Sequence, residues 1–363
     1  MSDNHHTIAP AQPPAPRRPA VPSYQGVSSP AALLRAIPLG HGARVGEFRA
    51  AVRAVLDGTD DRLLVIAGPC SVHDPLAAVQ YGQWLARRQA EYRGDLLLVM
   101  RAYVDKPRTL HGWKGLVNDP FLDGSGDVAA GLRTARALLV QLAADGVPAA
   151  TEWVDPLLVP YLADAVTWGT IGARTTESQV HRRLASALAM PVGFKNSPDG
   201  DPQAAVDACV VAAGAHAFLG PGPADGAPAV TRSGGNRDTC VVLRGGRHGP
   251  NYQRSYVSAT LSLLGLAGLD RRVVIDASHG NSGKNHHRQR EVALAIAAQA
   301  GRDEEIAGVM LESFLVAGRQ ELAGDPATLA YGQSVTDACM GLDETGEVLA
   351  ALAEAVARRR RSR

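Results

Sequence analysis

The sequence has few cysteines and no close pair of them. Its four cysteines are Cys70, Cys209, Cys240 and Cys339, and no two of them form a CxxC motif. This spacing excludes the disulfide framework of a small secreted domain, and it excludes a zinc ribbon. A reducing compartment is therefore expected.

Long apolar runs are also absent. No run reaches the roughly 18 residues that a membrane helix needs. The N-terminal residues lack the apolar core of a secretory signal. We therefore expect a cytoplasmic protein that is neither exported nor inserted in a membrane.

Neither sign of charge is in excess. Lys and Arg together number 37 and Asp and Glu number 36, so the net charge is +1. Because the chain has no large overall positive charge, it is not expected to bind nucleic acid. Any binding of anions must depend on a local group of basic side chains. The content of 45% hydrophobic and only 5% aromatic residues suits packed helices and short buried strands.

Short apolar runs recur from residue 63 onward, each followed by a turn and an amphipathic stretch, as in βα units. Eight runs predict strands at 63–68, 96–101, 148–153, 170–174, 191–196, 216–220, 272–277 and 306–311. Eight units favour a closed (β/α)8 barrel of the TIM type. A further pair of runs, 229–233 and 239–245, flanks a Gly-Gly-Asn turn and predicts a hairpin inserted after strand six.

The barrel is expected to occupy residues 63–363. Residues 1–26 are rich in Pro and Ala without periodicity, so a disordered tail is expected there. Residues 27–62 form an N-terminal extension, which looks helical from Pro30 to Leu56. Its apolar positions would pack on the barrel or on another subunit.

Polar and reactive side chains follow the carboxyl ends of the predicted strands. They are Cys70, Arg101, Glu152, Arg174, Lys195, Asp276, His279 and Glu312. In a barrel these ends meet at one face, where active sites are built. A doubly wound open sheet is the alternative, but it would offer a single crevice and leave many of these residues unexplained.

The segment 96–120 is the densest part of that face. Its apolar run is followed by Arg101, Lys106, Arg108 and Thr109. Three fixed cations and a hydroxyl can hold phosphate or carboxylate, which predicts a small, multiply anionic substrate. A solvated basic loop is the alternative, and the apolar strand directly before the cations argues against it.

Four distant segments each bring one candidate metal ligand to the same face. These are Cys70, His279, Glu312 and Asp337. A thiolate, an imidazole and two carboxylates suit a first-row divalent ion such as manganese, iron, cobalt or zinc. Each residue taken alone has a structural explanation, as a packing cysteine, a loop histidine or a helix cap. Their shared location favours the metal.

Eight sequence blocks together resemble the microbial type I 3-deoxy-D-arabino-heptulosonate 7-phosphate (DAHP) synthases. The blocks are GPCSVHDP, MRAYVDKPRTLHGWKGLVNDP, IGARTTESQVHR, PVGFKNSPDG, LRGGRHGPNY, IDASHGNSGK, GVMLESFLVAG and YGQSVTDAC. They occur in order, with matching spacing, from about Pro30 to Ala357. Eight ordered blocks are far more specific than one short motif.

The resemblance implies a metal-dependent condensation of phosphoenolpyruvate with erythrose 4-phosphate and water, the first step of the shikimate pathway, by a homodimer or homotetramer. It places the divalent metal on Cys70, His279, Glu312 and Asp337. It places phosphoenolpyruvate on Arg101, Lys106, Arg174, Lys195 and Arg244. It places the phosphate of erythrose 4-phosphate on Arg108 and Thr109.

Catalytic roles are inferred from the reaction that the resemblance implies, and the role of Glu152 from its position at a strand end. Lys106 is the expected proton donor to the new alkoxide, and Glu152 is expected to orient the water that adds at the former enol carbon. Cys70, His279 and Asp337 would act in catalysis through the metal, which polarises the sugar aldehyde.

One region departs from the family pattern. Residues 218–236 differ where regulated members form a feedback site for Phe or Tyr, so no effector is assigned. We hypothesise an enzyme insensitive to feedback that supplies an aromatic secondary metabolite. Strong inhibition by any single aromatic amino acid would contradict this hypothesis.

Two other functions remain open. A related synthase could use an amino-erythrose phosphate or arabinose 5-phosphate, although the intact KPRT element (106–109) argues against the five-carbon sugar. The second open function is that of an inactive homologue that acts as a regulatory subunit. Loss of a metal ligand or of a phosphate-binding cation would favour it. None is lost here.

Overall fold

The computed structural model describes residues 22–107, 112–322 and 324–362. At its centre lies a closed barrel of eight parallel strands in the order β1, β10, β9, β8, β5, β4, β3, β2. The strands are β1 (Leu63–Gly68), β2 (Leu96–Arg101), β3 (Ala149–Glu152), β4 (Trp168–Ile171), β5 (Val192–Lys195), β8 (Thr239–Leu243), β9 (Val273–Asp276) and β10 (Ile306–Glu312). The barrel closes where Leu64 of β1 lies level with Gly308 of β10. The predicted (β/α)8 fold is confirmed.

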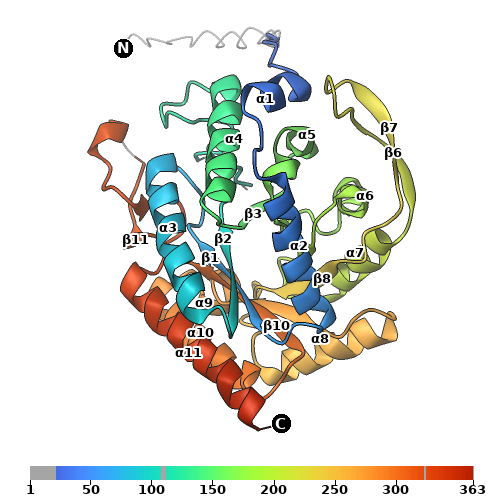
Figure 1. The fold of residues 1–363 in the computed structure, drawn as a ribbon, viewed down its shortest axis with the longest axis vertical. Helices are drawn as coiled ribbons and strands as arrows, with labels where there is room; N and C mark the ends of the chain where they lie inside the picture. The colour runs from blue at the N-terminus through green and yellow to red at the C-terminus, as the bar shows by residue number, and fades with distance from the viewer. Residues whose placement is uncertain (1–21, 108–111, 323, 363) are drawn as a thin grey trace, which may run out of the picture.

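Helices surround the barrel on its outer side (Figure 1). The longer ones are α3 (Pro75–Tyr92), α4 (Val128–Ala144), α6 (Gln179–Ala187), α7 (Gln203–Ala213), α8 (Arg254–Leu266), α10 (His286–Ala300) and α11 (Leu342–Arg361). Shorter elements are α5 (Val159–Leu162), α9 (His279–Ser282), η1 (Pro156–Leu158), η2 (Ala163–Ala165), η3 (Pro326–Thr328) and the strand pair β11 (Val316–Arg319) and β12 (Gln333–Ser334). Within the described part of the chain, no helix has the length and apolar character needed to cross a membrane.

The barrel strands are apolar along their whole length because both of their faces are covered. Every residue of β1, β2 and β10 is buried. One face of each strand points into the barrel and the other packs under the surrounding helices. Continuous apolar runs therefore predicted these strands well.

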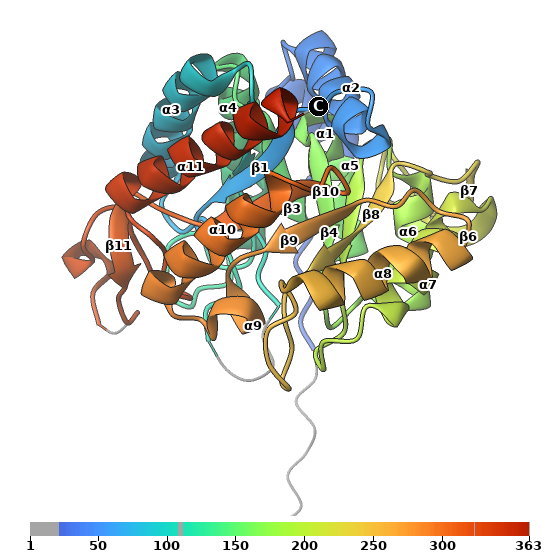
Figure 2. The same ribbon diagram turned by 90° about the horizontal axis from the view of Figure 1, so that it is seen from below.

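Two helices precede the barrel, α1 (Pro30–Ala36) and α2 (Gly42–Asp57). Val52 and Val55 of α2 are fully buried in the same apolar cluster as Leu64 and Ile66 of β1. Arg49 donates hydrogen bonds to the carbonyl of Val166, which precedes β4. Figure 2 shows α2 at one end of the barrel and α9 at the opposite end. Helix α2 thus packs on the barrel, as its apolar positions predicted, and leaves the other end for the site.

The prediction of strand six and of the hairpin after it was wrong. The run predicted as strand six forms β6 (His216–Pro221), which pairs antiparallel with β7 (Pro228–Ser233) outside the barrel. The sixth barrel strand is β8, whose residues were predicted above to form the second strand of the hairpin. The hairpin therefore precedes the sixth strand.

Burial explains the difference. Residues of β6 and β7 alternate between exposed and half-buried, whereas β8 is buried after its first residue. The Gly-Gly-Asn turn does not reverse the chain into a hairpin. Instead Asn236 donates to the carbonyls of Ala185 and Met190 and anchors the entry to β8.

The C-terminal arginines fasten α11 to the barrel. Arg360 donates to Asp61 (2.8 Å) and to Asp95 (2.7 Å), which flank the starts of β1 and β2. We expect Arg360→Ala to lower the free energy of unfolding by about 1 kcal/mol, because the ion pairs are partly exposed. Urea denaturation measures this, with the neighbouring exposed Arg361→Ala as the control that should change little. Equal effects of the two substitutions would contradict a specific role for Arg360.

Candidate active site

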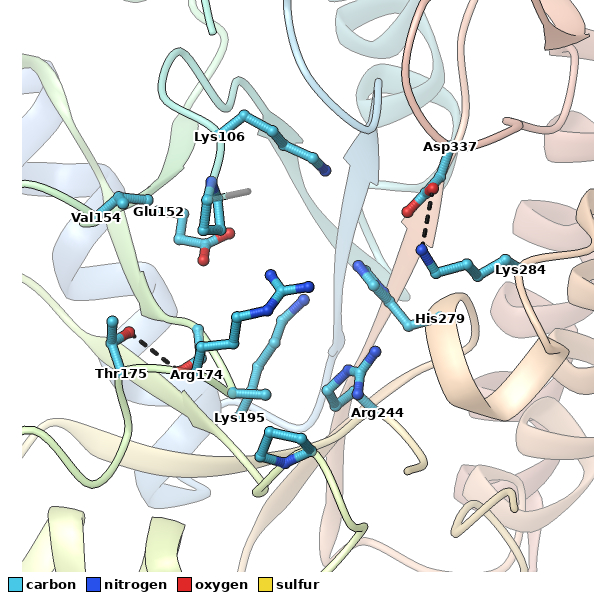
Figure 3. Close-up of a pocket in the computed structure, with 14 residues that line it drawn as sticks. Lys106, Glu152, Val154, Arg174, Thr175, Lys195, Arg244, His279, Lys284 and Asp337 are labelled. Carbon is cyan, nitrogen blue, oxygen red and sulfur yellow. Dashed lines mark hydrogen bonds and ion pairs between the residues drawn. The ribbon is translucent and has the colours of Figure 1, made fainter. Parts of the chain in front are cut away.

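A cavity of about 340 Å³ opens at the carboxyl ends of the barrel strands (Figure 3). Seven of the residues predicted from the sequence line it: Lys106, Glu152, Arg174, Lys195, Arg244, His279 and Asp337. They lie at or after the carboxyl ends of seven different barrel strands, so the closed barrel brings together positions that lie far apart in the sequence.

The wall of the cavity carries more cations than anions. Lys106, Arg174, Lys195 and Arg244 contribute four positive charges, and their side chains point toward a common centre in Figure 3. A cavity of this charge suits a ligand with several negative groups.

Lys284 is a fifth cation in the wall, and it was not predicted from the sequence. Its Nζ lies 3.2 Å from Oδ1 of Asp337. It follows a short helix, α9, and therefore does not belong to the pattern of polar residues at strand ends. Its backbone is left-handed (φ 61°), a conformation uncommon for lysine that often occurs at functional sites.

Three of the four predicted metal ligands lie together. The ligand atoms of Cys70, Glu312 and Asp337 are all within 4.8 Å of one another. His279, the fourth, points its Nε2 at Oε1 of Glu312 at 3.5 Å. The set offers one sulfur, one nitrogen and carboxylate oxygens, which fits a first-row divalent metal.

The imidazole of His279 is held from its other side. Its Nδ1 lies 2.9 Å from Oδ2 of Asp276 and 2.6 Å from Oγ of Ser278. Metal-binding histidines commonly have such a partner, which leaves the second ring nitrogen free to bind. Burial lowers the pKa of His279, outweighing the opposing effect of Asp276, which favours the neutral ring that a metal requires.

Lys106 and Cys70 form a close pair. Nζ of Lys106 donates to Sγ of Cys70 at 2.8 Å. Burial, with Glu312 nearby, raises the pKa of the Cys70 thiol. Burial alone would lower the pKa of Lys106, but the negative charges of Cys70 and Glu312 outweigh burial, so the pKa of Lys106 is raised. Lys106 therefore holds its proton at the edge of the cavity.

Carboxylates near the cavity are kept ionised by the cations around them. Burial alone would raise the pKa of Asp337, but Lys106 and Lys284 outweigh burial and lower this pKa to about 2. The pKa of Asp276 is held well below its usual range because His279 and Lys195 outweigh its burial. Nζ of Lys195 lies 2.9 Å from Asp276, and burial lowers the pKa of this lysine.

Arg101 does not line the cavity. It is 1% exposed, and its guanidinium lies 3.7 Å from the centre of the Tyr103 ring. It donates to the carbonyl of Cys70 and to Glu312, each at 3.2 Å. In this structure Arg101 therefore supports the candidate metal ligands, and its contact with phosphoenolpyruvate stays a prediction.

Three buried asparagines join the loops around the cavity, and no motif in the sequence predicts them. Asn196 accepts from the backbone of Arg244 at 2.7 Å. Asn251 donates to Asn196 (3.2 Å), and its backbone donates to Asn281 (2.7 Å). This network holds the loops after β5, β8 and β9 at fixed positions. Such contacts depend on the closed barrel and are invisible in any one segment.

Arg108 and Thr109, predicted to bind the second phosphate, lie outside the described residues. The neighbouring Lys106 and Pro107 do line the cavity. Phosphate binding by Arg108 and Thr109, the second half of the KPRT element, therefore stays a prediction.

Comparison with known proteins gives one consistent result. The model of the DAHP synthetase I family matches residues 39–350. A phospho-2-dehydro-3-deoxyheptonate aldolase of Corynebacterium glutamicum is 47% identical over 351 residues, covering 94% of each chain. The Phe-sensitive aldolase of the same name from Escherichia coli is 48% identical over 335 residues, covering 91% of this chain and 95% of its own. The solved structure of the Francisella tularensis aldolase is 44% identical, with a TM-score of 0.91 over 94% of this chain and 99% of that one.

Proposed function

We propose that this chain, which belongs to the DAHP synthetase I family, condenses phosphoenolpyruvate with erythrose 4-phosphate and water to give DAHP and phosphate. The observation that carries the proposal is one cavity with five cations in its wall, which also includes Asp337 of the cluster of Cys70, Glu312 and Asp337. Such a cavity can bind two phosphorylated substrates next to a metal ion.

Binding of the substrates follows from charge. Two phosphates and a carboxylate repel one another when they are held close together. Arg174, Lys195, Arg244 and Lys106 offset this repulsion and hold the reacting carbons within reach. In the proposed arrangement Arg108 and Thr109 hold the phosphate of erythrose 4-phosphate.

Cys70, His279, Glu312 and Asp337 would hold a divalent manganese, iron, cobalt or zinc ion. When bound, the ion supplies Lewis-acid activation of the sugar aldehyde. As a ligand, Cys70 would be a thiolate despite its burial, because a metal removes the thiol proton. A reducing compartment suits such a ligand, since oxidation of the sulfur would remove it.

The proton and the water are handled by the chain's own residues. A carbon–carbon bond forms between the methylene carbon (C3) of phosphoenolpyruvate and the aldehyde carbon, and Lys106 gives its proton to the new alkoxide oxygen. Water adds at C2, the carbon that carries the phosphate oxygen. The bond from C2 to this bridging oxygen then breaks and leaves a ketone, and of the two protons of the water one goes to the departing phosphate and one restores Lys106.

Glu152 is the candidate for orienting the water. Its carboxylate lies in the cavity wall against Gly172, and a side chain at position 172 would overlap it. Gly172 therefore leaves the space that Glu152 occupies. From this wall the carboxylate can accept a hydrogen bond from a water beside the substrate.

Cleavage at carbon is the feature that tests this mechanism. Phosphoenolpyruvate labelled with oxygen-18 at the bridging position is supplied with erythrose 4-phosphate, and the phosphate is examined by phosphorus NMR. The label should appear in the released phosphate. Label retained in the seven-carbon product would mean that the phosphorus–oxygen bond breaks, and the mechanism would be wrong.

The alternative sugar is tested in the same assay. An amino-erythrose phosphate differs from erythrose 4-phosphate at one group, so the two sugars are compared directly. Ratios of kcat/KM for erythrose 4-phosphate, the amino sugar and arabinose 5-phosphate decide the question. We expect erythrose 4-phosphate to give the highest value.

Assembly and regulation are open to direct measurement. A homodimer or homotetramer is proposed, and light scattering after size-exclusion chromatography measures it.

Relatives of similar identity are named Phe-sensitive, Trp-sensitive and tyrosine-inhibited, so these names select no effector for this chain. Our proposal of a feedback-insensitive enzyme predicts full activity with each aromatic amino acid added singly.

A further inference from the structure

Lys106 projects from a loop whose two ends are joined. The backbone N–H of Lys106 donates to the carbonyl of Lys114 at 3.0 Å, and that of Val117 donates to the carbonyl of Val104 at 3.0 Å. Gly115 has a φ of 107°, and a Cβ there would lie 2.8 Å from the Cα of Asp105. The base of the loop is therefore tightly packed.

The carboxylate of Asp105 links the two sides of this base. Oδ1 accepts from the backbone N–H of Lys106 and from Nδ2 of Asn118, each at 2.9 Å. Asn118 also donates to the carbonyl of Lys114 at 3.2 Å. One oxygen atom thus links the backbone of Lys106, the proposed proton donor, to Asn118 on the far side of the loop.

Asp105 has no role in the mechanism above, although burying a carboxylate is costly. It is 5% exposed and does not line the cavity. Among the described residues, the charged side chains with the largest effect on it are Asp155, before η1, and Glu152, at the end of β3, and both are acidic. Its N–H donors are neutral groups. This is an unfavourable place for a negative charge, which points to a use for it.

We propose that Asp105 is a positioning residue for the condensation proposed above, and that its ionised carboxylate fixes the direction in which Lys106 enters the cavity. Hydrogen bonds to a carboxylate are roughly twice as strong as those to a neutral group, so protonation loosens the base of the loop. Burial raises the pKa of Asp105 to about 6, with Asp155 and Glu152 adding to it and the N–H donors opposing it. The carboxylate is thus ionised above this pH and neutral below it.

The test is the pH dependence of kcat/KM for phosphoenolpyruvate in the wild type, Asp105→Asn and Asp105→Ala. The wild type should lose activity as the pH falls through about 6. Asp105→Asn keeps an acceptor oxygen without the charge, so this part of the acid limb should disappear. Asp105→Ala should lose about tenfold or more at pH 7.5, because a shift of about 1 Å in a reacting group costs up to a hundredfold.

Two further variants complete the design. Asn118→Ala removes the other donor and should lower kcat/KM to a similar extent, which keeps the proposal testable if Asp105→Ala fails to fold. Asp123→Asn, at an exposed position of the following loop, is the matched control and should behave as the wild type. An acid limb unchanged in Asp105→Asn, or wild-type activity in folded Asp105→Ala, would overturn the proposal.

A binding measurement separates this proposal from the proposed function. The affinity for phosphoenolpyruvate is measured by calorimetry at pH 7.5 and pH 5.5 in the manganese-loaded wild type and in Asp105→Asn. The wild type should bind more weakly at the lower pH, and the variant should change less. If the wild type turned over none of the sugar phosphates but showed this difference, the proposed function would fail while the role of Asp105 in holding Lys106 would stand. Equal changes in the two proteins would overturn that role.

Discussion

Cys70→Ala is expected to reduce turnover about a thousandfold or more, since Lewis-acid activation contributes several kcal/mol to a transition state. The substitution removes the only sulfur from the cluster of Cys70, Glu312 and Asp337. The remaining oxygen and nitrogen atoms should hold the ion more weakly. Steady-state assays and metal analysis of the purified variant together measure both effects.

Cys209→Ala is the matched control for this substitution. Cys209 is equally buried but packs in α7, on the outside of the barrel. Its loss should leave turnover and metal content near those of the wild type. A Cys70→Ala enzyme with wild-type turnover and full metal content would contradict the assignment of Cys70 as a ligand.

Lys106→Met is expected to lower kcat by about a hundredfold to ten-thousandfold, the usual contribution of general acid catalysis. Methionine keeps the length and apolar body of the side chain but cannot donate a proton. Phosphoenolpyruvate should also bind more weakly, because one of the cations in the wall is lost. A KM effect with unchanged kcat would limit Lys106 to binding.

Lys114→Met provides the control on the same loop. Lys114 is exposed, and its backbone carbonyl, not its side chain, accepts from Lys106. The substitution should therefore leave kcat and KM unchanged. An equal loss in both variants would point to the loop as a whole instead of the Lys106 ammonium group.

The barrel could be predicted because its strands are continuous apolar runs. β1 and β2 have the bounds expected from the sequence, since both faces of a barrel strand are buried. The error at β6 and β8 arose because two apolar runs lie close together in the chain. Only β8 is buried on both faces, and that distinction depends on tertiary packing.

The candidate site was predictable where a reactive side chain directly follows a strand. This pattern identified Cys70 and Glu312 of the metal cluster and most of the cations in the cavity wall. It did not identify Lys284, which follows a short helix, or Asp105, whose importance lies in contacts across a loop. It also could not show that Arg101 is buried and does not line the cavity.

The most direct test is consumption of phosphoenolpyruvate by the purified chain with erythrose 4-phosphate. The assay is run with added manganese, after removal of metal by a chelator, and after manganese is restored. We predict turnover that releases one phosphate per phosphoenolpyruvate, disappears on chelation and returns with the metal. No turnover by the folded, manganese-loaded protein, or turnover that is unaffected by chelation, would contradict the function and the metal site proposed for it.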